Sequence, residues 1–466
     1  MSSTTETAAR NRSAAPGAHR RASQRRAVRS RELHLSVNIN DGGRHPAGWR
    51  AVSNPRAFLT LEHFQELGRV AERGTFDAIL IPDGIGLAEL PPTRPWMAIE
   101  PTIAMTAMAA VTTHVGFIGT ASTTFNEPFN VARRFAAVDH ISGGRAAWNI
   151  VTSLAPFAAA SFGLDAESFP TPAARYRRAA EFVDVVLKLW SSWDDDALAA
   201  DQATGTFALA DGIHPVNHAG EHFTVHGPLS LPRTPQGRPV LVQAGASPEG
   251  VDLSARYADV VFTAATDIEQ ARSACADVKA RAASYGRDPE SIKYLPGLYA
   301  IVGGTEEEAN QKFDALNDLL NFDHELIRVA EMLGLDPAGV RLDAHLPDGP
   351  TIDQDSYTLS RGFLKAAWDR AREGNPTFRE LVVRNVTGHR QIVGAPEQIA
   401  DNIQTWFEAR AADGFVLNFT TVPDGLSEFV DHVVPILRKR GLFRSEYPGN
   451  TLRDSFGLAY PADHRS

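Results

Sequence analysis

From residue 33 onward, short apolar runs alternate with longer segments in which apolar side chains recur every three or four positions. Within residues 127–141, for example, Phe129, Ala132 and Phe135 share one face, which is the spacing of an amphipathic helix. Strands that alternate with helices are typical of a parallel sheet covered by helices. The apolar runs predict strands at residues 33–39, 78–82, 115–122, 146–153, 239–247, 259–265, 293–303 and 415–419.

Helical periodicity follows nearly every one of these predicted strands. A repeat of eight strand–helix pairs predicts an α/β fold, a (β/α)8 TIM barrel, because an open doubly wound sheet rarely needs so many repeats. The helices are expected at residues 59–73, 101–111, 127–141, 173–190, 248–257, 269–285, 306–320, 396–411 and 427–440.

Two segments do not fit the repeat. Residues 191–238 separate the fourth and fifth predicted strands, and residues 321–392 separate the seventh and eighth. Both are too long for plain connections, so the sequence predicts insertions after strands 4 and 7 of a single barrel domain over residues 32–466. Because the active site of such a barrel lies where its strands end, we expect both insertions to cover that end as a lid or substrate pocket.

The composition is that of an ordinary soluble globular protein, with 43% hydrophobic and 22% charged residues. No stretch approaches the roughly 18 consecutive apolar residues of a transmembrane helix, so no membrane partner is expected. The single cysteine, Cys275, excludes a disulfide framework and a cysteine-based zinc site. A lone thiol suits a reducing compartment, and we expect a cytoplasmic protein.

The charge is unevenly distributed. Residues 1–31 hold eight arginines and one acidic residue, Glu6, so this arm carries about +7 of a total of −10 and leaves about −17 on the rest of the chain. The arm is rich in Ala, Ser and Arg with few large apolar residues, which predicts a disordered basic arm. An arm that binds nucleic acid or a membrane is the alternative, but an acidic body argues against nucleic acid as the main partner.

Four histidines recur every four residues, which on a helix would stack metal ligands. Pro215 and Gly220 interrupt this segment, however, and it has the character of a hairpin or loop. We therefore expect surface histidines and no metal site. The four are His214, His218, His222 and His226.

Small polar residues gather where the predicted strands end. Ser247 is followed by Pro248 and Glu249, the pattern of a helix start whose free backbone N–H groups favour a phosphate. Ser247 as a helix cap alone is the alternative interpretation. The chain lacks the common dinucleotide, P-loop and esterase fingerprints. The other polar strand-end residues are Asp83, Thr120, Ser122, Asn149, Thr152 and Ser153, and together they favour a polar cofactor at the barrel mouth.

Several long motifs resemble the bacterial luciferase-like flavin monooxygenases, in the branch of the nitrilotriacetate, dibenzothiophene sulfone and long-chain alkane monooxygenases. The resemblance extends from about residue 33 to 461. The motifs are EPFNVARRFAAVDHISGGRAAWNIVTS (127–153), HPVNHAGEHFTVHGPLSLPRTPQGRPVLVQAGAS (214–247), VGAPEQIADNIQTWFEARAADGFVLNF (393–419) and TLRDSFGLAYP (451–461).

The resemblance implies the oxygenase component of a two-component system that binds FMN without a covalent link. A separate NAD(P)H:flavin reductase would supply the reduced flavin, and O2 would then oxygenate a small organic substrate. A homo-oligomer, dimer or tetramer, is expected. Two alternatives stay open at this point: a deazaflavin-dependent oxidoreductase of the same superfamily, and a flavin-binding barrel without catalysis.

Residue by residue, the resemblance assigns Asp83 to the isoalloxazine ring and His45 to the substrate side, where it would exchange a proton. The alternative for His45 is a loop histidine with a structural hydrogen bond. Asn149, Thr152 and Ser153 match groups beside the ring and ribityl chain, and Tyr176 and Ser247 match the phosphate ligands. The implied cofactor-binding set is Asp83, Thr120, Asn149, Thr152, Ser153, Tyr176, Ala246 and Ser247, and the implied catalytic pair is His45 and Asn149.

The chain departs from the family at three places, one of which is Leu154, where the family often has a polar or aromatic residue after the VTS motif. Pro172 stands where the family often has histidine, and Ala246 stands where it often has serine. These changes would weaken FMN binding or mark a subfamily with its own substrate. An apolar side of the pocket is expected from Phe125, Leu154, Phe157 and Phe162, and the late histidines His324, His345 and His389 are unranked candidates for its lining.

Overall fold

Eight parallel strands close into a barrel, as predicted. Their order around the barrel is β9-β11-β1-β2-β3-β4-β7-β8, and the pairing of β8 with β9 closes the ring. In the computed structural model the strands are β1 (His34–Asn38), β2 (Ala78–Ile81), β3 (Gly116–Ser122), β4 (Ala146–Val151), β7 (Val240–Gln243), β8 (Val260–Thr263), β9 (Lys293–Val302) and β11 (Gly414–Asn418). The structure describes residues 31–87, 93, 95, 99–153, 156–164, 169–245, 247–351, 364, 367–369, 371–384 and 389–464, so almost all of the basic arm lies outside it.

One strand of the large parallel sheet was not predicted. β10 (Arg390–Gly394) pairs with the carboxyl-terminal half of β9, from Leu298 to Val302, outside the closed ring. β9 is ten residues long and extends beyond its partner β8, which pairs with it only as far as Pro296, and this leaves backbone groups on the same edge for β10 to bond. The sequence analysis had placed Arg390 within the second insertion.

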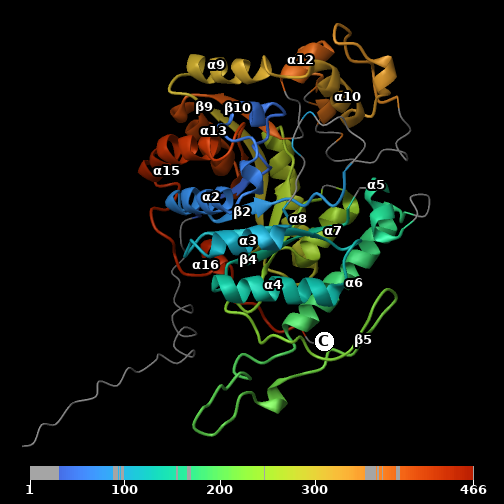
Figure 1. The fold of residues 1–466 in the computed structure, drawn as a ribbon, viewed down its shortest axis with the longest axis vertical. Coiled ribbons are helices and arrows are strands. Elements are labelled where there is room, and N and C mark those ends of the chain that lie inside the picture. The colour runs from blue at the N-terminus through green and yellow to red at the C-terminus, as the bar shows by residue number, and fades with distance from the viewer. Residues whose placement is uncertain are drawn as a thin grey trace, which may run out of the picture. The chain divides into compact units, whose positions relative to one another are not determined.

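Helices cover the outside of the barrel (Figure 1). The expected helix over 427–440 is interrupted, because Pro435 cannot donate a backbone hydrogen bond: a π-helical turn at Phe429–Val433 separates α14 (Asp424–Glu428) from α15 (Val434–Lys439). The other principal helices are α2 (Leu61–Arg73), α3 (Pro101–Ala109), α4 (Pro128–Ser142), α6 (Pro172–Trp190), α7 (Pro248–Tyr257), α8 (Ile268–Ser284), α9 (Glu306–Asn317) and α13 (Pro396–Glu408). Shorter ones are α1 (Gly48–Ala51), α5 (Pro156–Ala159), α10 (Phe322–Met332), α12 (Phe378–Val383) and α16 (Leu452–Ser455).

The first inserted segment does not lie where we expected. Gln236 donates to Asp139 Oδ1 at 2.6 Å and to Ala146 O at 2.8 Å, at the end of α4 and the start of β4. Residues 191–238 therefore meet the barrel at the amino-terminal end of its strands, opposite the end where active sites form. The reason is that α6 runs back along the barrel before the insertion begins. The segment contains a small hairpin, β5 (His218–Ala219) with β6 (Thr224–Val225).

The second inserted segment follows α9 and has its own apolar cluster. Leu333, Trp368, Phe378 and Leu381 are all at most 5% exposed within it. In Figure 1, α9, α10 and α12 lie together at the top, on the side where β9 and β10 are labelled. Unlike the first segment, the second lies on the side of the carboxyl-terminal end of β9.

The closing TLRDSFGLAYP motif seals the amino-terminal end of the barrel. Leu452 and Phe456 are fully buried and belong to the apolar cluster of the barrel interior. A Cβ on Gly116 of β3 would lie 2.4 Å from Leu452 Cδ1, so only glycine leaves room for this plug. Within the described part of the chain, no helix is long and apolar enough to cross a membrane.

Replacing the plug residue Phe456 by alanine should destabilise the protein by about 3–5 kcal/mol, the range for a large aromatic removed from a packed core. Ile141→Ala is the matched control, because Ile141 is 65% exposed and should change stability by no more than about 0.5 kcal/mol. Urea unfolding of both variants measures the difference, and equal midpoints would show that the closing motif does not seal the core.

Candidate active site

The interior of the barrel becomes polar at the carboxyl end of its strands. Asn38 Nδ2 donates to Asn418 Oδ1 at 3.0 Å, and Asn149 Nδ2 donates to Thr120 Oγ1 at 3.0 Å. None of these four residues is more than 7% exposed. The side-chain oxygens of Asn38 and Asn149 are buried without a hydrogen-bond donor among the described residues. Because a buried acceptor without a donor costs free energy, this polar layer is suited to a bound molecule that donates N–H groups.

A second polar feature lies at the start of α7. Ser247 is the N-cap of this ten-residue helix, and its Oγ accepts from the backbone N–H of Gly250 at 3.1 Å. The hydroxyl of Tyr176, from α6, lies against the same turn: a Cβ on Gly250 would be 2.9 Å from it, and one on Gly245 would be 3.1 Å away. The structure therefore brings Tyr176 and Ser247 together at a helix start that only glycines leave open, which is the setting of an anion site.

The ends of β3 and β4 are tied together between these two features. Ser153 Oγ hydrogen-bonds Ser122 Oγ at 2.6 Å, and Thr124 Oγ1 donates to the backbone carbonyl of Thr152 at 2.7 Å. Ser153 has a φ of 48°, a left-handed conformation that is unfavourable for a non-glycine residue. Such residues are concentrated at functional sites, where surrounding contacts hold them in place.

Asp83 follows β2, and the pKa of its carboxyl group is raised. Burial raises its pKa to about 6, with a further contribution from the carboxylate of Glu100, while Arg134 opposes the shift. Arg134 itself pairs with Glu100 at 3.1 Å. A carboxyl group that titrates near neutrality beside a cleft is a frequent feature of active sites.

His45 is placed differently from the expectation. Its Nδ1 accepts from the backbone N–H of Ala47 at 3.1 Å, and its Nε2 donates to Asn317 Oδ1 at 3.2 Å. The ring is 3% exposed, and this burial lowers its pKa. Both ring nitrogens are engaged within the protein, which favours the interpretation of a loop histidine with structural hydrogen bonds. A catalytic role for His45 stays a prediction.

Some of the expected pocket residues can be placed and others cannot. Phe125 and Phe162 stack with centroids 4.6 Å apart, next to the end of β3. Pro172 is the first residue of α6, so the residue that replaces the family's histidine begins a helix that Thr171 caps. Ala246, Leu154 and the side chain of Phe157 lie outside the described residues.

The sequence analysis missed part of the polar layer. Asn38 and Asn418 fall on the same side of their strands as the interior residues Ser36 and Val416, so strand alternation could have found them.

Two of the late histidines differ in their exposure to solvent. His345 is exposed and its Nδ1 contacts the carbonyl of Asn375 at 3.0 Å, whereas His389 is only 6% exposed.

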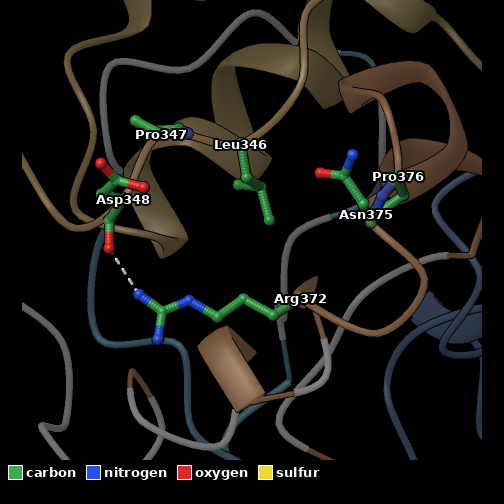
Figure 2. Close-up of a pocket in the computed structure, with 6 residues that line it drawn as sticks. All are labelled: Leu346, Pro347, Asp348, Arg372, Asn375 and Pro376. Carbon is green, nitrogen blue, oxygen red and sulfur yellow. Dashed lines mark hydrogen bonds between the residues drawn. The ribbon is translucent and has the colours of Figure 1, made fainter.

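The cavity shown in Figure 2 lies within the second inserted segment. It measures about 390 Å³, and one of its walls is held by Arg372, which donates to the carbonyl of Asp348 at 2.6 Å. A smaller space of about 30 Å³, near the ends of β1 and β2, has room for about one water molecule. The larger cavity is lined by Leu346, Pro347, Asp348, Arg372, Asn375 and Pro376, none of which belongs to the polar layer or the α7 turn.

The four histidines that recur every four residues lie in the first insertion, and two of them contact carboxylates. His218 Nε2 contacts Glu181 at 3.0 Å, and His214 Nε2 contacts Asp194 at 3.2 Å. Glu181 also accepts from the backbone N–H groups of His222 and Phe223, so it fixes the β5–β6 hairpin to α6. Across the described ranges, no three His, Cys, Asp or Glu side chains gather as metal ligands would.

Residues 40–413 match the luciferase-like monooxygenase family. The chain belongs to this family. It is 40% identical over 440 residues to N-acetyl-S-(2-succino)cysteine monooxygenase of Bacillus subtilis, an alignment that covers 93% of this chain and 98% of the relative. It is also 40% identical over 448 residues to nitrilotriacetate monooxygenase component A of Aminobacter aminovorans, with the same coverage.

Solved structures agree with this assignment. EDTA monooxygenase from Chelativorans superimposes with a TM-score of 0.76 at 34% identity, covering 92% of this chain and 99% of that one. A structure from Hyphomicrobium sulfonivorans superimposes with a TM-score of 0.82 at 30% identity, covering 94% and 93%. The chain is thus a flavin-dependent monooxygenase, and the predicted family, enzyme class and barrel fold are confirmed.

The pKa of Asp83 predicts a specific pH dependence. A raised pKa means that the folded protein holds this proton more tightly than the unfolded chain, so the stabilisation is present below about pH 4 and is lost as pH rises through about 6. Asp83→Asn should therefore raise the melting temperature relative to wild type more at pH 7.5 than at pH 5. Asp314→Asn, an exposed carboxylate on α9, is the control. A melting-temperature difference between Asp83→Asn and wild type that is the same at both pH values would contradict a raised pKa for Asp83.

Proposed function

We propose that this protein is the oxygenase component of a two-component FMN-dependent monooxygenase. It would take reduced FMN from a separate NAD(P)H:flavin reductase and use O2 to oxygenate a small organic substrate. The observation that carries the proposal is the pairing of a buried polar layer, whose Asn38 and Asn149 oxygens have no donor among the described residues, with a helix start suited to an anion. The chain that holds both is 40% identical to monooxygenases over most of its length.

The residues present fit FMN at both ends. The turn before α7 supplies backbone N–H groups, the Ser247 hydroxyl and the Tyr176 hydroxyl for a phosphate. The oxygens of Asn38 and Asn149 supply acceptors for the N–H groups of the isoalloxazine. Thr152 and Ser153 directly follow β4 in the chain, and their side chains would hydrogen-bond the ribityl hydroxyls.

Reduced FMN supplies the electrons with which O2 is activated. The protein's own contribution is to bind, to orient and to exclude water. Thr120 holds the amide of Asn149 in one orientation, so that its oxygen is presented as an acceptor. The stacked Phe125 and Phe162 provide an apolar border, and such a border protects reactive species from hydrolysis. Asp83, with a pKa of about 6, is a group that can hold or release a proton near the working pH.

The alternatives have weaker support. Two solved structures of enzymes named as dependent on the deazaflavin F420 are 15% and 16% identical to this chain, which is a likeness of fold alone. The relatives at 40% identity are named as monooxygenases, which favours catalysis over a non-catalytic flavin-binding barrel. One of them is named as component A of its system, which favours a partner reductase here too. We further propose a homo-oligomer in the cytoplasm.

Ser247→Ala should weaken FMN binding by about 1–2 kcal/mol, or roughly 5- to 30-fold in dissociation constant, because the phosphate loses a hydroxyl donor. The change also removes a helix cap. Thr60→Ala controls for that loss, since Thr60 caps α2 by accepting from the backbone N–H of His63. FMN titration followed by flavin fluorescence measures both. A Ser247→Ala affinity within twofold of wild type would remove Ser247 from the phosphate site.

The proposed function is tested by measuring NADH consumption and O2-dependent product formation. The purified protein with FMN should not consume NADH, because the chain lacks a dinucleotide fingerprint. Adding a flavin reductase, or FMN reduced by light, should support O2-dependent product formation with some member of a panel built from the relatives' substrates. Steady NADH consumption by the isolated protein would contradict the two-component assignment.

A further inference from the structure

A buried histidine lies over the two strands that close the barrel. His389 precedes β10, and its ring stacks on Phe262 of β8 with centroids 5.3 Å apart and planes inclined by 25°. A Cβ on Gly297 of β9 would lie 2.3 Å from His389 Nδ1. No side chain at position 297 is compatible with this contact, so the glycine makes room for the imidazole.

Phe262 and Gly297 face the barrel interior. Val260 and Leu295 each lie two positions earlier on the same strands and belong to the interior apolar cluster, and residues two apart share a face. Gly297 is in register with Val416 of β11, and the next inward residue of β11 is Asn418 of the polar layer. The imidazole of His389 therefore enters the interior beside the polar layer.

The position of His389 around the barrel also matters. β9 is four strands away from β3 in either direction around the closed ring. His389 over β9 thus lies across the interior from Thr120 of β3 and its partner Asn149 of β4. An eight-stranded barrel has an interior only wide enough for side chains or one small ligand. A molecule seated over the polar layer must therefore lie between the Thr120–Asn149 pair and the Phe262–His389 pair.

We propose that His389, backed by Phe262, contacts the isoalloxazine ring of the bound flavin. The inference rests on the proposed function, since it takes FMN as the occupant. Stacked aromatic rings present a flat apolar surface that suits a planar ring system, and the imidazole adds a hydrogen-bonding edge. Its stacking on Phe262 and its entry into the interior over Gly297 assign His389, among the late histidines, to the binding machinery.

The test is FMN titration of the full-length protein, read by flavin fluorescence and by the visible absorption spectrum of the bound flavin. His389→Ala should raise the dissociation constant roughly 3- to 10-fold, the range for losing an aromatic contact. It should also shift the bound spectrum, which reports contacts to the ring. Gly297→Ala should act in the same direction, because its methyl group displaces an intact imidazole. His345→Ala, an exposed histidine of the same insertion, should match wild type in both readouts.

His389→Gln, which keeps a polar side chain but removes the ring, carries the test if the alanine variant does not fold; it should show the same spectral shift. Wild-type affinity and an unshifted spectrum in the folded His389 variants would overturn the proposal. Equal losses in His345→Ala would overturn it too, since the effect would then not be specific to the mouth. Failure of the wild-type protein to bind FMN would instead overturn the proposed function, and this inference with it.

Discussion

Strand alternation in a closed barrel is the constraint on which the site depends. Each strand must send every second side chain into one shared interior, and an eight-stranded interior is filled by those side chains. Below the mouth most of them are apolar and fill it, as Leu80, Ile118 and Val242 do. At the mouth they are Asn38, Thr120, Asn149 and Asn418. These side chains hydrogen-bond one another in pairs, but among the described residues the oxygens of Asn38 and Asn149 receive no hydrogen bond. The remaining acceptors are what a bound cofactor would complete.

The two ends of the barrel differ in role: the amino-terminal end contributes to stability, and the carboxyl-terminal end holds the candidate site. At the amino end, Asp77 is fully buried and pairs with Arg444 at 2.7 Å and His34 at 2.9 Å, while Leu452 and Phe456 plug the interior. The buried carboxylate of Asp77 therefore has a cationic and a hydrogen-bonding partner, as a buried charge requires. At the carboxyl end, the buried side-chain oxygen of Asn149 has no donor within the part of the chain that the structure describes, and Ser153 adopts an unfavourable φ. The first insertion joins the stabilised end, which separates it from catalysis.

The sequence predicted the repeating part of the structure well. All eight barrel strands and the helix start at Ser247 follow from local apolar runs and capping residues, which depend on neighbours in the chain. β10 was missed because its pairing depends on the extra length of β9, a tertiary feature. The first insertion was misplaced because its end of the barrel depends on the direction of α6. His389 could not be ranked, since its contacts, Phe262 and Gly297, are distant in sequence.

The most direct test of the account is a crystal structure of the protein with FMN. The account predicts the phosphate at the start of α7, within hydrogen-bond distance of Ser247 and Tyr176, and the isoalloxazine over Asn149 and Thr120. Flavin density in the cavity lined by Arg372 and Asp348, with the α7 turn and the polar layer free of it, would contradict the account.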